Sequence, residues 1–489
     1  MRTSLKCPTG ARKQVVVILC LCIALPLGIN SVDFNESTNM VGGWVDQIKS
    51  NSTSGNVDLS LLLSVRVYGS MTASLLGICI GPRIGTKRLI LVYAVTALFG
   101  NLISFLSIHF GQYWLLVLSR IVTGIGNVGA WMAAINYLTE ISSRRYRGLT
   151  IFLLIIAHEK GMALGTILAG PSVLGRSGIW PYILLVVCAL YLLPLLLLLK
   201  YPESPRHLLY IKRDPEAALD SIRFFNNTAD GMEELESLVT GIQKIENSSR
   251  NRSMCSSAFW REFRKPFFVS VGLAGVFSFG SRYILFNLSV FILHQCGFSW
   301  TAAGNANIAV IVIVLVGMLS CSKLMDQFER RNILRAGMIA AFLCQVSMLV
   351  ISLIKTYIGD YAVVRAFAIF IMTLWFFSVN VGLMPCYIVV SEMFSQNHRN
   401  MGLAVFSAVA SLIGATSSVV YPLTTMSIGM LWLLVAFTIC SLSVFFKLPK
   451  TTGIPLEEVG FGDSQKNVED IAAVLPLLME TKKRQSIEK

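Results

Sequence analysis

The sequence predicts an all-α membrane protein with twelve transmembrane helices arranged in two six-helix bundles. Of its 489 residues, 54% are hydrophobic and only 14% are charged, which is too little charge to coat a soluble protein of this length. Apolar windows of about 18 to 25 residues recur along the chain, and each is long enough to cross a ~30 Å hydrocarbon core as a helix. A central hydrophilic segment separates the first six windows from the last six.

The spans follow one another in two sets with short polar loops between them. The first six are expected near residues 15–32, 59–80, 88–108, 112–138, 149–171 and 180–199. The last six are expected near residues 267–295, 302–322, 335–355, 361–393, 401–425 and 429–447. The window at 361–393 is longer than one lipid-exposed span requires. The corresponding domains are an N-terminal bundle (1–200), a cytoplasmic helical linker (201–266), a C-terminal bundle (267–448) and a cytoplasmic tail (449–489).

Basic residues set the orientation of these spans. They gather in alternate loops: before the first span, and after the second, fourth and eighth, as with Arg83, Lys87, Arg144 and Arg331. The positive-inside rule therefore places both termini in the cytoplasm. It also explains the net charge of +14 without nucleic acid as a partner. A cleaved signal peptide at 15–28 is the alternative for the first span, but it lacks a small-x-small cleavage pattern, so we favour an uncleaved helix.

The first outer loop carries two glycosylation sequons, at Asn35 and Asn51, which this topology places outside the cell. The central segment reads as short helices; Asp214 and Pro215 form a typical N-cap with proline at the first helical position.

The two halves repeat each other in their inner loops. The sequence GPRIGTKR at 81–88 follows the second span, and DQFERR at 326–331 follows the eighth. Similarly, YLTE at 137–140 with Arg147 is echoed by SEMF at 391–394 with Arg399. Carriers built from such repeats usually hold their substrate between the halves, near the membrane midplane.

Three motifs in order carry a family resemblance. They are RIVTGIG at 120–126, YPESPR at 201–206 and PKTTGIPLEE at 449–458. Together they resemble the sugar porters of the major facilitator superfamily, over residues 60 to 459, and are nearest the facilitative hexose and trehalose carriers of insects. The glycines of the first motif allow close helix approach.

The resemblance implies a cytoplasmic gate of charged residues that pair across the halves in one state and separate in the other. The matching residues here are Arg83, Arg120, Glu140, Arg147, Glu203, Arg206, Asp326, Arg330, Arg331, Glu392 and Arg399. The alternative is that these charges only orient the protein. For Arg83 the two interpretations are balanced, whereas Glu140 and Glu392 favour the gate because an acid in a basic loop contributes nothing to orientation.

The sugar site of the family is altered in this chain. The paired glutamines of the seventh span fall on Phe277 and Ser278, and the tryptophan of the tenth falls on Cys386. The candidate substrate-binding residues are Glu159, Ser278, Arg282, Tyr283, Asn287, Asn380 and Cys386.

Ionisable residues inside the spans are the remaining candidates. Glu159 and Arg282 would both face a central cavity, so we hypothesise that they form an ion pair or that one of them binds a charged or strongly polar substrate. The alternative is that Glu159 pairs locally, with Lys160 or His158 snorkelling elsewhere. Arg66 and Arg365 lie near the outer ends of their spans, where we expect them to snorkel.

These observations predict a plasma-membrane carrier that moves a small polar solute by alternating-access facilitated diffusion. A hexose or trehalose is the leading candidate for the solute. The first span contains no acid, which argues against proton coupling, although a midplane glutamate such as Glu159 can carry protons. The alternatives are a carrier with a changed substrate, such as an organic ion, and a non-transporting nutrient sensor. No P-loop, metal-ligand spacing or enzyme motif is present in the sequence, so we expect no cofactor, and the partners are the solute and the lipid bilayer.

Overall fold

The computed structural model describes residues 11–32, 38–48, 55–142, 147–171, 173–176, 178–225, 257–320, 328–359, 361–394 and 399–448, with a few positions between 232 and 240. Asn35, Asn51, Asp326 and the tail from 449 onward lie outside the described residues. The predictions made for them remain predictions.

Long helices account for nearly all of the described chain. The N-terminal half contains α1 (Ala11–Val32), α3 (Gly55–Ile84), α4 (Thr86–His109), α5 (Tyr113–Ile141), α6 (Arg147–Ala169) and α7 (Tyr182–Lys200). The C-terminal half contains α11 (Ser257–Phe279), α12 (Arg282–Gln295), α13 (Trp300–Ser320), α15 (Arg330–Tyr357), α16 (Ala362–Phe377), α17 (Pro385–Met393), α18 (Arg399–Val420) and α19 (Met426–Phe445). The helices α11 and α12 together form one broken rod, that is, one interrupted span, and α16 and α17 form another. Counted in this way, each half has six rods, which agrees with the predicted pattern.

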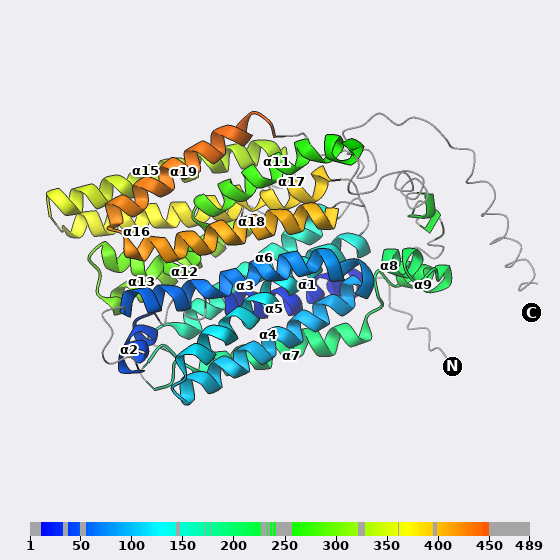
Figure 1. Cartoon of the computed structure of the whole chain (residues 1–489), viewed down its shortest axis with the longest axis horizontal. Coiled ribbons are helices and arrows are strands. Elements are labelled where there is room, and N and C mark those ends of the chain that lie inside the picture. Colours follow the sequence, from blue (N-terminus) through cyan, green and yellow to red (C-terminus); the bar gives the residue numbers. More distant parts are fainter. Residues whose placement is uncertain are drawn as a thin grey trace, which may run out of the picture.

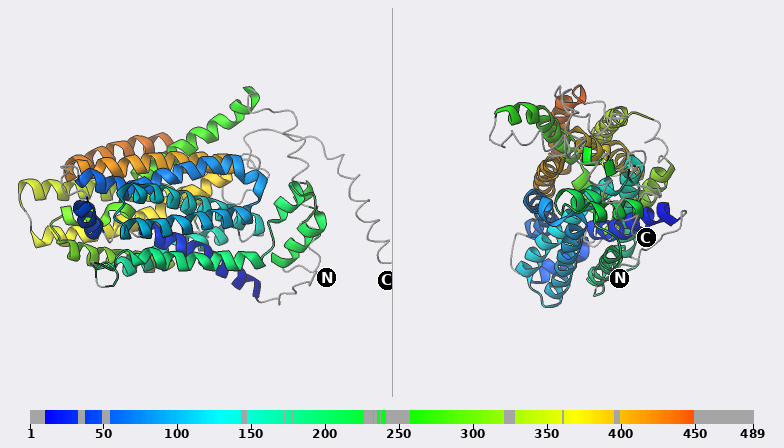
Figure 2. Two further views of the ribbon diagram at one scale, coloured as in Figure 1. Left: turned by 60° about the horizontal axis from the view of Figure 1, so that its bottom comes forward. Right: turned by 90° about the vertical axis from the view of Figure 1, so that its right-hand side faces the viewer.

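The two halves lie alongside each other with their rods along the long axis (Figure 1), and the end-on view shows the rods packed together (Figure 2). Short helices complete the described part. One is α2 (Thr38–Ile48), which the sequence did not predict, and α8 (Pro205–Tyr210) and α9 (Pro215–Phe225) lie beyond one end of the bundle. The last ten residues of the predicted linker belong to α11, which begins at Ser257.

Apolar side chains cover the outer surface of the rods. On α7, Leu196 and Leu199 are 63% and 67% exposed, and on α19, Ile439 and Leu442 are 65% and 64% exposed. Such stripes are costly in water but suit a lipid environment. Within the described residues, nine helices are long and apolar enough to cross a membrane.

Two rods are broken at the level of the protein centre. The chain leaves α11 at Gly280 and passes through Ser281, whose φ is +77°. The carbonyls freed there are satisfied by neighbouring side chains: Gln345 Nε2 donates to Phe279 O at 2.7 Å and Trp375 Nε1 donates to Gly280 O at 3.1 Å. Broken helices at membrane depth require such internal partners.

The second break is a π-helical turn, η2 (Ser378–Leu383), between α16 and α17. Pro385 at the start of α17 lacks an N–H, and this favours interruption of the rod at that point. The sequence predicted one span at 361–393. In the structure, the π-helical turn interrupts this span and changes the directions in which its side chains point.

The glycines of the RIVTGIG motif allow the close helix approach that the sequence predicted. A Cβ added at Gly124 would lie 1.9 Å from the carbonyl oxygen of Arg66 on α3, and one added at Gly126 would lie 2.3 Å from the backbone nitrogen of Ala97 on α4. The backbones of three helices therefore meet with no room for a side chain.

We predict that Gly124→Ala destabilises the protein by about 1–3 kcal/mol, since α3 and α5 must separate. Gly77→Ala on α3 is the matched control, because a Cβ there meets nothing within 4 Å and alanine is the better helix former. Thermal unfolding of the purified variants in detergent measures both. Equal melting temperatures for the two variants would contradict the packing role of Gly124.

Candidate functional site

A buried ion pair joins the two halves near the centre of the protein. Arg282, the first residue of α12, donates from Nη2 to Oε1 of Glu159 on α6 at 2.8 Å. It also donates to the side-chain oxygen of Asn380 in η2, and its guanidinium carbon lies 3.8 Å from the centre of the Phe286 ring. The side chains of Arg282 and Glu159 are 8% and 6% exposed. The predicted ion pair is therefore present.

The local alternative for Glu159 is also part of the arrangement. His158 Nδ1 lies 3.4 Å from the same carboxylate oxygen that Arg282 contacts. Glu159 thus contacts its sequence neighbour and the opposite half at once.

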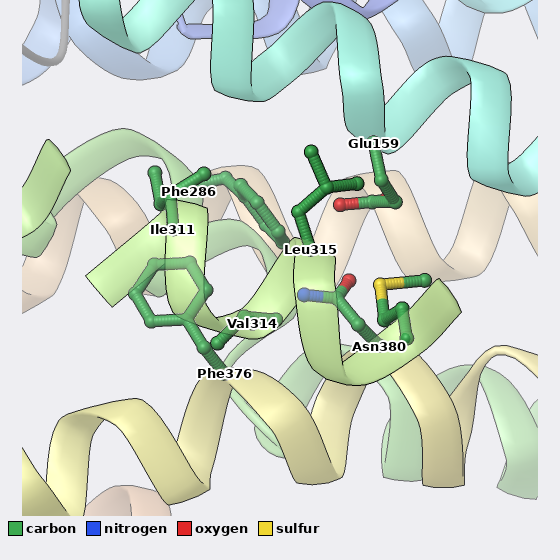
Figure 3. Close-up of a pocket in the computed structure, with 8 residues that line it drawn as sticks. Glu159, Phe286, Ile311, Val314, Leu315, Phe376 and Asn380 are labelled. Atoms are coloured by element: carbon green, nitrogen blue, oxygen red, sulfur yellow. The ribbon is translucent and has the colours of Figure 1, made fainter. Parts of the chain in front are cut away.

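Behind the ion pair lies a small, mainly apolar pocket. Glu159 and Asn380 supply its polar wall and extend toward it from opposite elements (Figure 3). Its other walls are Phe286, Ile311, Val314, Leu315, Met318 and Phe376. This low-polarity surrounding strengthens the electrostatic attraction between the paired charges and raises the cost of leaving either one unpaired.

The main cavity lies between the halves and encloses about 690 Å³, part of it open to solvent. Polar and aromatic side chains from both halves form its wall. They are Ser31, Arg66, Ser70, Asn127, Trp131 and His158 from the N-terminal half, and Phe277, Arg282, Tyr283, Phe286, Asn287 and Tyr387 from the C-terminal half.

A chain of hydrogen bonds shapes the N-terminal wall of this cavity. His158 Nε2 lies 3.4 Å from the Ser31 hydroxyl, and Asn127 Nδ2 donates to the same hydroxyl at 3.3 Å. Tyr191 OH donates to Asn127 Oδ1 at 3.1 Å. These contacts hold the end of α1 against α5 and α6.

The prediction that Arg66 snorkels to the outer surface is wrong, because this residue is only 8% exposed. Its Nη1 donates to Asn30 O at 2.9 Å, and its Nη2 donates to Ser31 O at 2.8 Å and to Asn287 Oδ1 at 3.3 Å. The last carbonyls of a helix lack intrahelical partners and carry partial negative charge. Arg66 therefore caps α1 and reaches α12 of the opposite half, which keeps it inside.

Five of the seven predicted binding residues lie at the centre of the protein, and two do not. Glu159, Arg282 and Asn380 meet at the ion pair, and Tyr283 and Asn287 line the main cavity. Ser278 and Cys386 line neither described cavity. Ser278 donates to Ala410 O at 2.8 Å, which turns it toward α18. Cys386 is fully buried beside Tyr387, and one residue of helix rotates it about 100° away from the wall.

Sequence reasoning missed several residues of the cavity wall. Arg66 and His158 were visible as ionisable groups within spans, a signal that favours cavity-facing positions. Trp131 and Tyr387 gave no such signal, because aromatic residues also face lipid in a membrane protein.

The predicted gate residues at one end of the bundle make close contacts within the N-terminal half. Glu203 accepts from the backbone N–H of Lys87 at 2.8 Å, so it caps the start of α4. Thr86 donates to Glu140 at 3.2 Å. Gly85, with φ +94°, leaves no space for a Cβ, which would lie 2.9 Å from the His207 ring. This motif region therefore packs α4, α5 and α8 together.

Arg120 does not belong to that end of the bundle. It lies twenty residues before Glu140 on α5, about 30 Å along a straight helix, and is 1% exposed. Its assignment to the cytoplasmic gate is wrong. The RIVTGIG motif itself does not indicate which end of the helix carries the arginine.

For the remaining gate residues, the predicted ion pairs between the two halves stay a prediction. Arg331 donates to Glu329 at 3.4 Å in its own half, and Arg206 and Arg330 lie at the starts of α8 and α15 and are half-buried. The side chains of Arg83, Arg147, Glu392 and Arg399 lie outside the described part of the chain.

Comparison with solved structures agrees with this architecture. The major facilitator proton:xylose symporter XylE from E. coli, bound to 6-bromo-6-deoxy-D-glucose, matches 92% of this chain and 99% of its own with a TM-score of 0.78 at 18% identity. The fold is therefore that of a major facilitator carrier, two six-helix bundles around a central cavity.

Sequence comparison specifies the family. The model of the family described as Sugar (and other) transporter matches residues 28–460, so the chain belongs to that family. The facilitated glucose transporter member 2 of solute carrier family 2 from Gallus gallus is 27% identical over 426 residues, covering 84% of this chain and 76% of that protein. Member 4 from Mus musculus is 28% identical over 347 residues, covering 70% and 67%. These relatives are named as transporters, not enzymes.

We predict that Glu159→Gln or Arg282→Gln alone costs about 3–5 kcal/mol, because each leaves a buried charge without its partner. The double variant is expected to recover most of this loss, since neither charge remains. Thermal unfolding in detergent compares the three. A double variant as unstable as the sum of the single ones would show that the two residues act independently.

Proposed function

We propose that this protein is an alternating-access carrier that moves a small polar solute of sugar size, with a hexose or trehalose first, down its gradient across the plasma membrane. The observation that carries the proposal is the cavity between the halves, whose wall combines aromatic faces with hydrogen-bonding groups from both. The glucose carriers among the relatives support a sugar as the solute.

The wall suits a ring with one apolar and one polar side. Trp131 and Tyr387, one from each half, meet edge to face with their ring centres 6.5 Å apart, and both line the cavity. Aromatic faces pack against the C–H surface of a sugar ring, and hydroxyls then turn toward polar groups such as Asn287 and Tyr283. A solute that contacts both halves has different contacts in the outward-open and inward-open states. This difference in affinity is what allows the solute to shift the equilibrium between the two states.

Facilitated diffusion is favoured over proton coupling. The described residues of α1 include no aspartate or glutamate, and Glu159 is already engaged by Arg282 at 2.8 Å. The same proposal includes the cytoplasmic gate without Arg120, the cytoplasmic termini and glycosylation at Asn35 and Asn51. It also includes the four domains, with the C-terminal bundle extended to begin at Ser257.

The test is uptake of labelled glucose and trehalose by purified protein in liposomes, with and without a pH gradient. We expect saturable uptake that the gradient does not change, and at least a tenfold loss in Trp131→Ala. The matched control is Trp114→Ala on the same helix, because Trp114 is 71% exposed and does not line the cavity.

Three outcomes would contradict parts of this proposal. Absence of uptake of either sugar by folded protein would remove the sugar assignment and favour a sensor or another solute. Uptake that follows the pH gradient would replace facilitated diffusion with coupling. Equal losses in Trp131→Ala and Trp114→Ala would exclude the central cavity as the site.

A further inference from the structure

We propose that Asn287 binds a hydroxyl of the neutral sugar solute through its side-chain N–H, and that Arg66 is the positioning residue that turns this N–H toward the cavity. The inference rests on the proposed function, because it assigns one contact of the same solute in the same cavity. It goes further in naming the group that selects the solute and the conformational state in which the protein presents that group.

The side-chain amide of Asn287 has one atom with a partner and one without. Its Oδ1 accepts from Nη2 of Arg66 at 3.3 Å, whereas its Nδ2 has no hydrogen-bond partner among the described residues. Asn287 is only 5% exposed and lines the main cavity. A buried donor without an acceptor is costly, so a solute oxygen that accepts from Nδ2 gains more affinity than it would at an exposed amide.

Arg66 determines which atom of this amide is left for the cavity. Its guanidinium is held by two carbonyls of α1, Asn30 O at 2.9 Å and Ser31 O at 2.8 Å. A guanidinium has donors only, so the atom of Asn287 that faces it is the amide oxygen. The reversed amide would set N–H against N–H. The hydrogen-bond network therefore assigns the orientation, and the N–H remains for the solute.

The neighbouring polar groups of the wall already have partners within the protein. Asn127 donates to the Ser31 hydroxyl at 3.3 Å and accepts from Tyr191 at 3.1 Å. The Tyr283 hydroxyl lies 3.3 Å from a serine hydroxyl on α18. These groups keep spare lone pairs that a sugar can use, but each is satisfied in part without a solute. Nδ2 of Asn287 is not, which makes it the contact whose loss should weaken binding most.

This contact depends on how the two halves are placed. Arg66 is on α3 of the N-terminal half and Asn287 is on α12 of the C-terminal half. When α12 separates from α3, Asn287 loses the group that fixes its amide, and either amide atom can then face the solute. The affinity for the solute hydroxyl therefore differs between the two states. We expect bound solute to stabilise the state in which α3 and α12 are in contact.

Substituents at a single sugar carbon distinguish a protein donor from a protein acceptor. A hydroxyl donates and accepts, fluorine accepts weakly and never donates, and hydrogen does neither. An N–H therefore prefers hydroxyl to fluorine and fluorine to hydrogen. A carboxylate only accepts, so it still prefers hydroxyl but ranks fluorine last, because it repels the electronegative atom.

The experiment is competition with uptake of labelled glucose or trehalose, whichever the purified protein takes up in liposomes. The competitors are deoxy and deoxyfluoro analogues of that sugar, one for each hydroxyl. We expect one position at which the deoxy analogue competes at least about fivefold less well than the parent sugar, with fluorine recovering part of the loss. Equal competition by the parent sugar and every deoxy analogue would overturn the inference.

Asn287→Asp identifies the protein group. It keeps the side-chain shape and a partner for Arg66 but replaces the donor by an acceptor, so the order of the fluoro and deoxy analogues should reverse at that position. Asn305→Asp is the matched control, because Asn305 on α13 is exposed and lines neither described cavity. An unchanged order in Asn287→Asp, in protein whose melting temperature is preserved, would overturn the assignment.

Arg66→Met tests the positioning role. It removes the donor that faces Oδ1, so the amide of Asn287 can present either atom, and the advantage of fluorine over hydrogen should fall below about twofold. A purely structural loss of activity would lower uptake without changing this ratio of two probes. An unchanged ratio in protein that still transports would overturn the role of Arg66. Asn287→Asp carries the decision if loss of the α1 cap prevents Arg66→Met from folding.

The outcomes also separate this inference from the proposed function. Saturable sugar uptake, with the same fluoro and deoxy ranking in the parent protein and in Asn287→Asp, would overturn the Asn287 contact and leave the carrier assignment intact. Absence of uptake of both glucose and trehalose by folded protein would overturn both.

Discussion

A charge in the middle of a membrane protein has to be paired, and Arg282 is the point on which the centre of this structure depends. Its guanidinium contacts Glu159 of the opposite half, Asn380 of the π-helical turn and the face of Phe286. Each of these neighbours comes from a different element. The break between α11 and α12 places Arg282 at midspan, and the π-helical turn brings Asn380 to it. Two irregular segments are thus organised around one cation.

Arg66 complements this arrangement from the other side. It extends from the N-terminal half and reaches Asn287 on α12, while Arg282 extends from α12 and reaches the N-terminal half. The two arginines therefore cross the interface in opposite directions. Between them lies the wall of the main cavity, so the residues that join the halves are also those that face the solute.

The fold was readable from the sequence, because apolar periodicity and loop charge are properties of the chain alone. The twelve expected windows match the observed rods to within a few residues at most ends, and the Glu159–Arg282 pair was anticipated from the cost of isolated ionisable groups. The two breaks were not predicted. They occur at Gly280 and Pro385, but glycine and proline are also found inside unbroken spans of this chain, as with Pro26 and Pro194. The position of Arg120 was readable from the sequence, because residue 120 lies near the outer start of the span predicted at 112–138. The burial of Arg66 was not readable, because it depends on where α1 ends beside it, which only tertiary packing defines. The sequence does not give the rotation of each helix about its own axis. It therefore could not predict that Trp131 lines the cavity while Cys386 is buried in the core.

The stiffness of α12 has a kinetic consequence. Arg282 and Asn287 are five residues apart on one short helix, about 7.5 Å along its axis, and each is bonded to the opposite half. A helix of this length moves as a rigid rod, so a tilt about the Gly280–Ser281 break changes both contacts in the same event. Partial release, with one contact broken and the other intact, has little geometric freedom. The movement of α12 away from the N-terminal half should therefore be a single concerted step with one barrier, rather than a gradual loosening.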